Sequence, residues 1–177
     1  MRTLIQSEKG SSALSLLIFL LAFLAVFALV SDLARLYAAK ISVRHALNLS
    51  LRAASGQLDQ DRLADPEIPR VYILPLQARE IFDDALRENL RLDQGNNPQA
   101  GSVAGGPVEV SYFQVVNDVP FTYSWGAYSE TVTRPGVVGI IRVPVALGLF
   151  ARAATGAPGN LVLTVHSTVG PEVIATR

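Results

Sequence analysis

The residue types that most often carry out chemistry are few in this chain, and their spacing does not group them. His45 and His166 each lack a metal-ligand or base partner nearby in the sequence, so both are interpreted as structural or solvated. The acids of segment 59–65 lack the regular ligand spacing and closing glutamate of an EF-hand. Together with the pair at 83–84 they are better interpreted as solvated. Cysteine is absent, which excludes disulfides, thiolate metal sites and cysteine nucleophiles.

The common catalytic and nucleotide-binding motifs are also missing. No GxxxxGK[ST] phosphate loop and no GxSxG nucleophile elbow occurs. The glycine-rich stretch 101–106 follows an expected helix and precedes an expected strand, the reverse of a dinucleotide loop. The aromatic residues between Tyr112 and Tyr128 recur at the period of two that builds a sheet core more often than a ligand platform. We therefore expect no catalytic residue, no metal, no cofactor and no enzymatic activity.

Charge is distributed unevenly along a chain whose formal net charge is zero. Up to residue 55 six Lys and Arg oppose two acids, whereas the remainder has nine Arg against thirteen acids. A basic stem on an acidic body is typical of a protein that meets anionic lipid at one end and water at the other. No segment of the body gathers the cations that phosphate contacts require, so nucleic acid is excluded as a partner.

One apolar segment near the start is long enough to span a bilayer. Residues 13–30 read ALSLLIFLLAFLAVFALV, with Ser15 as their only polar side chain, and no charge occurs between Lys9 and Asp32. As a helix the uncharged run 11–31 reaches roughly 30 Å, the thickness of the hydrocarbon core. A cleaved signal peptide is the main alternative, but such peptides have shorter apolar cores and end at a small-x-small site. The sequence predicts a transmembrane helix over 11–31, after a leader of residues 1–10.

The helix is expected to continue as a stem over 32–55, because proline and glycine are absent until Gly56. An amphipathic stripe recurs along it at spacings of three and four, broken only at Arg44: Leu33, Leu36, Tyr37, Ile41, Leu47, Leu51 and Ala54. This length is roughly twice what spanning requires. Two explanations stay open and are compatible: the second half packs on the body's own sheet, or part of the stripe packs against related helices.

The remainder, 56–177, is expected to form an α+β body. An amphipathic pattern predicts a second helix over about 75–92, and a loop rich in Gly, Asn and Pro follows it. Alternation of period two predicts an antiparallel sheet of about four strands within 107–170, with a helix packed on one face. In the third of these runs Pro144 implies an edge strand or a break.

The residues on both sides of the apolar run resemble the TadE/TadG-like pilin-related proteins of the tight-adherence (Flp) type IV pilus system. The junction Glu8-Lys9-Gly10 before Ser11-Ser12-Ala13 is similar to the family's leader junction. Other matching features are Asp32, Arg35, Tyr37, Ala46, Arg52, Ala53 and Ala54, and the late segments IIRVPVALGLF and NLVLTVHSTVGPE. The resemblance covers roughly the first 55 and the last 40 residues.

The resemblance implies cleavage by a prepilin peptidase after Gly10, which leaves Ser11 as the new amino terminus. It also implies a single-pass protein of the bacterial cytoplasmic membrane with its body outside the cytoplasm, or within an extracellular pilus. Its partners are membrane lipid and other pilins or pseudopilins, contacted through the N-terminal helix, with Ser15, Asp32, Arg35 and Tyr37 as assembly residues.

Position 15 differs from the family pattern. Family members commonly have glutamate five residues after the cleavage point, where it neutralises a neighbouring subunit's amino terminus inside the bilayer. Ser15 stands there in this chain. An unpaired ammonium at membrane depth is costly, so the substitution suits a minor, priming or tip subunit. The expected function is therefore a minor pilin or pseudopilin, and the alternative is a single-pass anchored binding module that never enters a filament.

Overall fold

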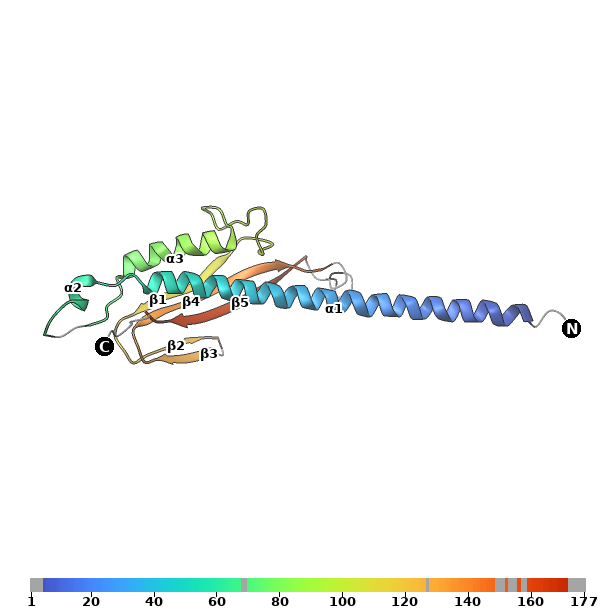
Figure 1. The fold of residues 1–177 in the computed structure, drawn as a ribbon, viewed down its shortest axis with the longest axis horizontal. Helices are drawn as coiled ribbons and strands as arrows, with labels where there is room; N and C mark the ends of the chain where they lie inside the picture. The colour runs from blue at the N-terminus through green and yellow to red at the C-terminus, as the bar shows by residue number, and fades with distance from the viewer. Residues whose placement is uncertain are drawn as a thin grey trace. The chain divides into compact units, whose positions relative to one another are not determined.

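The computed structural model describes residues 5–67, 70–126, 128–148, 152, 156 and 159–171, with side chains described from residue 12 onward. Its helices are α1 (Ile5–Ser55), α2 (Gln60–Leu63) and α3 (Pro75–Leu90). Its strands are β1 (Glu109–Val116), β2 (Phe121–Trp125), β3 (Tyr128–Val132), β4 (Gly136–Ala146) and β5 (Asn160–Val169) (Figure 1). The chain divides into two compact units, Met1–Ala38 with Leu147–Gly159, and Ala39–Ala146 with Asn160–Arg177.

Helix α1 is continuous over 51 residues, as the absence of proline and of helix-breaking glycine after Gly10 predicts. From Ala39 onward one side of it is buried at spacings of three and four, by Ala39, Val43, Ala46, Leu47, Ser50, Leu51 and Ala54. The buried Ser50 hydroxyl donates to the Ala46 carbonyl at 2.8 Å, so this polar group is satisfied within the helix. The helix ends at Ser55, directly before Gly56.

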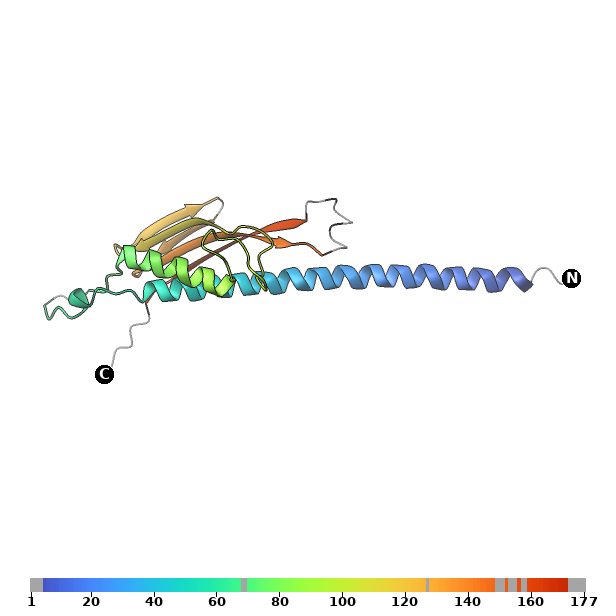
Figure 2. The same cartoon turned by 90° about the horizontal axis from the view of Figure 1, so that it is seen from above.

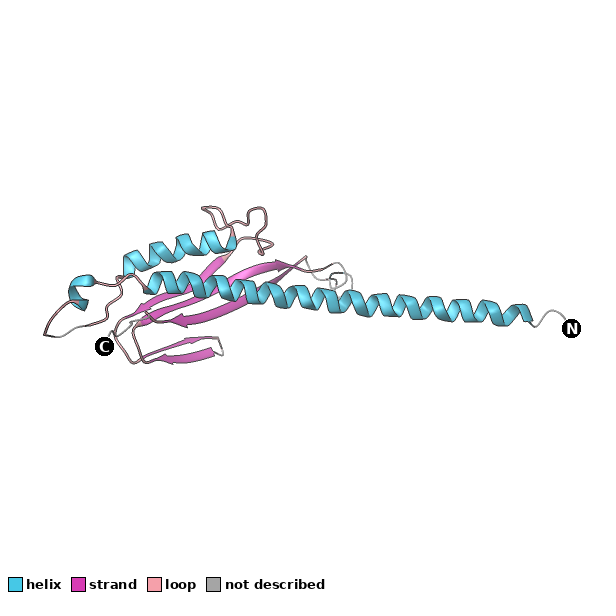
Figure 3. Cartoon of the chain, viewed as in Figure 1, coloured by secondary structure: helices cyan, strands magenta, loops and turns pink. Residues whose placement is uncertain are grey.

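The strands form two antiparallel sheets. Three strands pair in the order β1-β4-β5, and β2 pairs with β3 in a separate hairpin (Figure 3). The expected sheet of about four strands is therefore corrected to five strands in two sheets within the described residues. The sequence pattern did not reveal β3, because Glu130 occupies an inward position between Tyr128 and Val132 and breaks the apolar alternation.

Both long helices cover the same face of the three-stranded sheet. A Cβ placed on Gly139 of β4 would lie 2.9 Å from Leu51 Cδ2 and 3.3 Å from Leu47 Cδ1, so α1 lies directly on this glycine. Phe113 of β1 is the cross-strand partner of Gly139 and shares its face. The ring of Phe82 in α3 lies 4.7 Å from the ring of Phe113, centroid to centroid. Figure 2 shows α3 beside the end of α1 on that side.

The opposite face of the sheet carries a second core that includes the hairpin. Val116, Val138 and Ile140 of the sheet are buried with Tyr123 and Val132 of the hairpin. Strand β4 is thus covered on both faces, which explains why its first six residues, 136–141, are all buried and why they read as a continuous apolar run.

Pro144 lies in the central strand of the sheet, and that strand continues through it, so the expectation of an edge strand or a break is corrected. Pairing of β1 with β4 stops at Arg142, and at Pro144 only β5 continues alongside. The Pro144 carbonyl accepts from Gly105 N at 2.7 Å on the side that β1 has left. The N and C=O of one strand residue point to the same side of the strand. The N–H that proline lacks would therefore also point to the side that β1 has left, where no strand would accept a hydrogen bond from it.

Helix α3 is confirmed, with Ala78, Phe82, Leu86 and Leu90 buried as its apolar row. It ends two residues before the expected limit, because Arg91 adopts a left-handed conformation (φ 52°, ψ 65°). The Leu92 N–H then bonds back to the Arg87 carbonyl at 2.8 Å, which closes the last turn.

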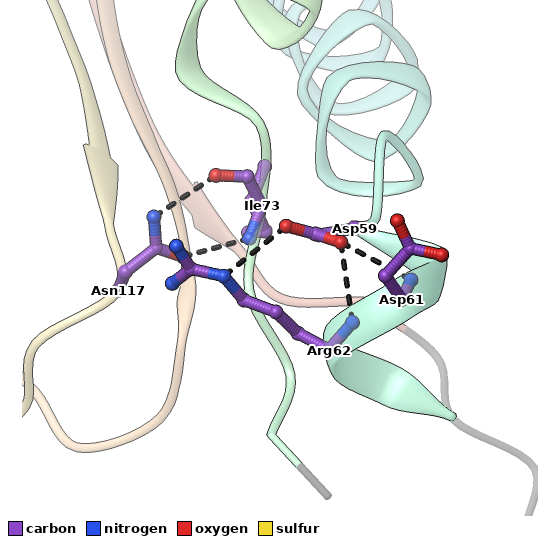
Figure 4. A network of polar contacts seen from close by, with 5 residues as sticks. All are labelled: Asp59, Asp61, Arg62, Ile73 and Asn117. Carbon is purple, nitrogen blue, oxygen red and sulfur yellow. Dashed lines mark hydrogen bonds and ion pairs between the residues drawn. The ribbon is translucent and has the colours of Figure 1, made fainter. Parts of the chain in front are cut away.

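The connection between α1 and α3, expected to be solvated, contains the short α2 and two polar anchors. Asp59 caps α2 by accepting from the N–H groups of Asp61 and Arg62, and its carboxylate pairs with the Arg62 side chain at 3.2 Å (Figure 4). The Asn117 amide bonds both backbone groups of Ile73: its Oδ1 accepts from Ile73 N at 2.8 Å, and its Nδ2 donates to Ile73 O at 2.9 Å. This pair holds the connection to the end of β1.

Candidate functional site

The first part of α1 exposes apolar side chains on every side. Large apolar residues from Leu14 to Val30 are each about half exposed or more within their unit. The helix is long and apolar enough to cross a membrane. A helix that is apolar all round needs an apolar environment on all sides, which a bilayer supplies. Ser15 lies exposed within this segment.

The predicted processing junction lies on the same helix. The backbone of Gly10 and Ser11 belongs to α1, while the side chain of Ser11 lies outside the described residues. Cleavage after Gly10 stays a prediction.

The apolar stripe expected on the stem divides into two parts with different surroundings. Leu47, Leu51 and Ala54 are fully buried against the body. Leu33, Tyr37 and Ile41 are instead 66%, 67% and 56% exposed. The first explanation of the stripe therefore holds for its second half, whereas these three residues of its first half stay exposed among the described residues.

Asp32 differs from the other expected assembly residues because it is buried, at 7% exposure. Its carboxylate lies directly against Gly148, so closely that a Cβ at that glycine would collide with both oxygens. Both residues belong to the same unit. The contact ties the start of the β4–β5 connection to α1, and only a glycine permits it. Arg35 and Tyr37 are exposed.

A second candidate feature is a carboxylate that gathers three hydroxyl donors. Glu130 Oε2 accepts from Tyr128 Oη at 2.6 Å, from Tyr123 Oη at 2.8 Å and from Thr168 Oγ1 at 2.9 Å. The Tyr128 ring also lies 3.9 Å from the ring of His166, centroid to centroid. The cluster joins β2 and β3 to β5, so it binds the hairpin to the three-stranded sheet.

The electrostatics of this cluster favour an ionised Glu130. Burial alone raises the pKa of Glu130, but the hydrogen bonds from Tyr128, Tyr123 and Thr168, together with nearby His166, hold it below its ordinary value of 4.5. Burial, and then hydrogen bonding to the carboxylate, raises the pKa of Tyr123. The pKa of Tyr128 is raised chiefly by its bond to Glu130. The two tyrosines therefore stay protonated donors, and the carboxylate stays an acceptor.

A pocket of about 590 Å³ adjoins this cluster. Glu130 and Thr168 line one part of it, and Thr133, Arg134 and Pro171 line another. Among the described residues no three His, Cys, Asp or Glu side chains come close enough to hold a metal ion. The arrangement can hold a hydrogen-bonding ligand.

Sequence reasoning did not identify Glu130, Thr168 or the pocket as a site. Glu130 and Thr168 are 38 residues apart and meet only through the fold. The available signal was an acid at an inward position of a period-two segment, where an apolar side chain is the rule. Comparison of the chain with family models, curated proteins and solved structures gives no match.

Proposed function

We propose that the chain is a minor pilin or pseudopilin of the tight-adherence type, a structural subunit that packs laterally through α1 during assembly of a pilus or a related secretion machinery. The observation that carries the proposal is the exposure of Leu33, Tyr37 and Ile41 beyond the segment that can span the membrane. A simple anchor needs about 20 apolar residues and no apolar surface above them. A subunit whose stem packs against related helices needs that surface.

Two further features support this function. The resemblance at Gly10 and Ser11 places a leader junction directly before the apolar run. Ser15, in place of the family glutamate, leaves the new ammonium of a neighbour without a carboxylate in the bilayer, and a subunit present in few copies tolerates this cost. In this role the body lies outside the cytoplasm and the prepilin peptidase is an obligatory partner.

The intact mass of the chain, extracted from membranes of cells with an active prepilin peptidase, tests the proposal. We expect a mass that lacks residues 1–10. The variant Gly10→Ala should keep its leader, whereas Gly56→Ala, a glycine change far from the junction, should mature normally. A native chain that retains its first residues in those cells would contradict assembly as a processed pilin.

A single-pass anchored binding module is the second candidate, and the pocket beside Glu130 and Arg134 favours it. Such a module keeps its leader and has no use for an exposed stem. The same mass measurement separates the two functions, because only the first requires cleavage.

A further inference from the structure

The outward side of α3 carries a row of acids. Glu80, Asp84 and Glu88 recur every four residues and are all exposed. They are offset by two positions from the buried row that begins at Ala78, which places them about 200° around the helix on its outer side. Asp84 pairs with Arg87 of its own helix, at 3.0 Å. Glu80 and Glu88 have no ion pair within the described residues.

The stem carries two exposed cations on neighbouring turns. Lys40 and Arg44 lie one turn apart on α1 and are both exposed, and neither makes an ion pair in the described part of the chain. In the sequence they come nine and thirteen residues after Ser31, the end of the uncharged run.

The acidic row and the two cations lie at matching heights in their unit. Phe82 in α3 meets Phe113, which faces Gly139, and Gly139 meets Leu47 and Leu51 of the stem. Helix α3 runs opposite to α1, so its Glu88 end points toward the Ala39 end of the stem (Figures 1 and 2). Two copies of this unit side by side in the same orientation would therefore bring Glu88 of one toward Lys40 of the other, and Asp84 toward Arg44.

We propose that a second copy of this chain docks laterally here, with the acidic row of α3 in one copy against Lys40 and Arg44 of the other. The charges are complementary, and the partner belongs to the acidic body that the sequence predicts. The contact rests on the proposed function only in that both copies are anchored in one membrane; it does not require cleavage. It is heterologous, so in a pair one copy keeps its cations free and the other keeps its acidic row free.

The absence of cysteine in the native chain allows a direct test by crosslinking. The full chain would be reconstituted into phosphatidylcholine vesicles as an equal mixture of two variants, Ile41→Cys and Asn89→Cys, and treated with a short thiol crosslinker. Both positions are exposed and adjoin the proposed contact without removing its charges. We expect a crosslinked dimer that disappears at high salt, because the Debye length falls to about 3 Å at 1 M.

Charge reversal then tests the pairing itself. Adding Lys40→Glu and Arg44→Glu to the Ile41→Cys chain should lower the crosslinked fraction about tenfold, since several pairs of modest strength become repulsive. Adding Glu80→Lys and Glu88→Lys to the Asn89→Cys chain should restore it.

The matched control replaces Asn89→Cys by Thr122→Cys, an exposed position on the outer face of the hairpin. Three results would each overturn the proposed contact. They are the absence of a crosslinked dimer in the first mixture, an equal crosslinked fraction in the control, and a crosslinked fraction that charge reversal does not change. Because the vesicles contain no peptidase and no other pilin, these results are independent of the mass measurement that tests the proposed function.

Discussion

The contact between Gly139 and α1 permits a quantitative test of how the stem meets the sheet. Replacing Gly139 by alanine puts a methyl group 2.9 Å from Leu51 Cδ2 and 3.3 Å from Leu47 Cδ1. Both leucines are fully buried, so neither can swing into solvent to relieve the contact. Overpacking of this kind costs about 1–3 kcal/mol. The reduced freedom of the unfolded chain returns about 0.4–1 kcal/mol. We expect Gly139→Ala to lower the free energy of unfolding by about 1–2 kcal/mol.

A second substitution identifies the atoms responsible. Leu51→Ala alone should cost about 2–5 kcal/mol through the cavity that it leaves. In the double variant the new methyl group enters that cavity. The loss of unfolding free energy in the double variant should therefore be about 1 kcal/mol smaller than the sum of the two single-variant losses. Gly56→Ala is the matched control. A Cβ there meets nothing nearer than the Ala53 carbonyl at 3.5 Å, and the change should stay within about 0.5 kcal/mol.

Urea unfolding of the full chain in detergent micelles provides the assay, with the fluorescence of Trp125, the single tryptophan, as the signal. Trp125 lies on β2, away from the substituted face, and its indole ring centroid is 6.3 Å from that of Tyr112. If Gly139→Ala unfolds at the native midpoint or above it, or if the two losses simply add, α1 does not lie on β4 in this register.

Three further predictions concern the other contacts. Gly148→Ala should destabilise the chain, because its methyl group would clash with the Asp32 carboxylate. In a chain that already carries Asp32→Ala the same change should cost little, and thermal melting of the variants measures both effects. Glu130→Gln should cost about 1–3 kcal/mol at pH 7, where the carboxylate accepts three hydroxyl bonds. The pKa of Glu130 in the folded chain is depressed, so this stabilisation is present above the ordinary value of 4.5 and is lost as pH falls through the folded pKa. The melting temperatures of the variant and the native chain should therefore converge at acidic pH. Asn117→Ala should cost about 1–3 kcal/mol by leaving both backbone groups of Ile73 unpaired, which faster amide exchange at Ile73 would report.

Controls for these predictions are available in the same chain. Glu109→Gln removes a carboxylate of an exposed pair with Arg142, at 3.3 Å, and should cost less than about 1 kcal/mol. A loss at Glu130 no larger than the loss at Glu109, or one that persists unchanged at acidic pH, would show that the hydroxyl cluster does not stabilise the ionised carboxylate.

Local patterns in the sequence were sufficient to predict the helices and strands that form because of their own residues. The length and apolarity of α1 follow from an uncharged run without proline, and α3 follows from an apolar period of 3.6. Strands β1, β2, β4 and β5 follow from alternation or from continuous apolar runs. Strand β3 was not predicted, because a polar side chain that is satisfied by distant partners looks like a surface position.

The stripe on α1 shows what the sequence by itself determined and what only the tertiary structure decided. Its spacing, broken only at Arg44, established an amphipathic helix from Leu33 to Ala54. Which of its residues are covered depends on the side of the helix that meets the sheet, and α1 lies on the sheet at Gly139, which has no side chain. The burial of Asp32 against Gly148 and the three hydroxyls around Glu130 likewise join residues far apart in the chain. Periodicity records the neighbours a residue has along its own element, whereas the fold alone determines the neighbours it meets across elements.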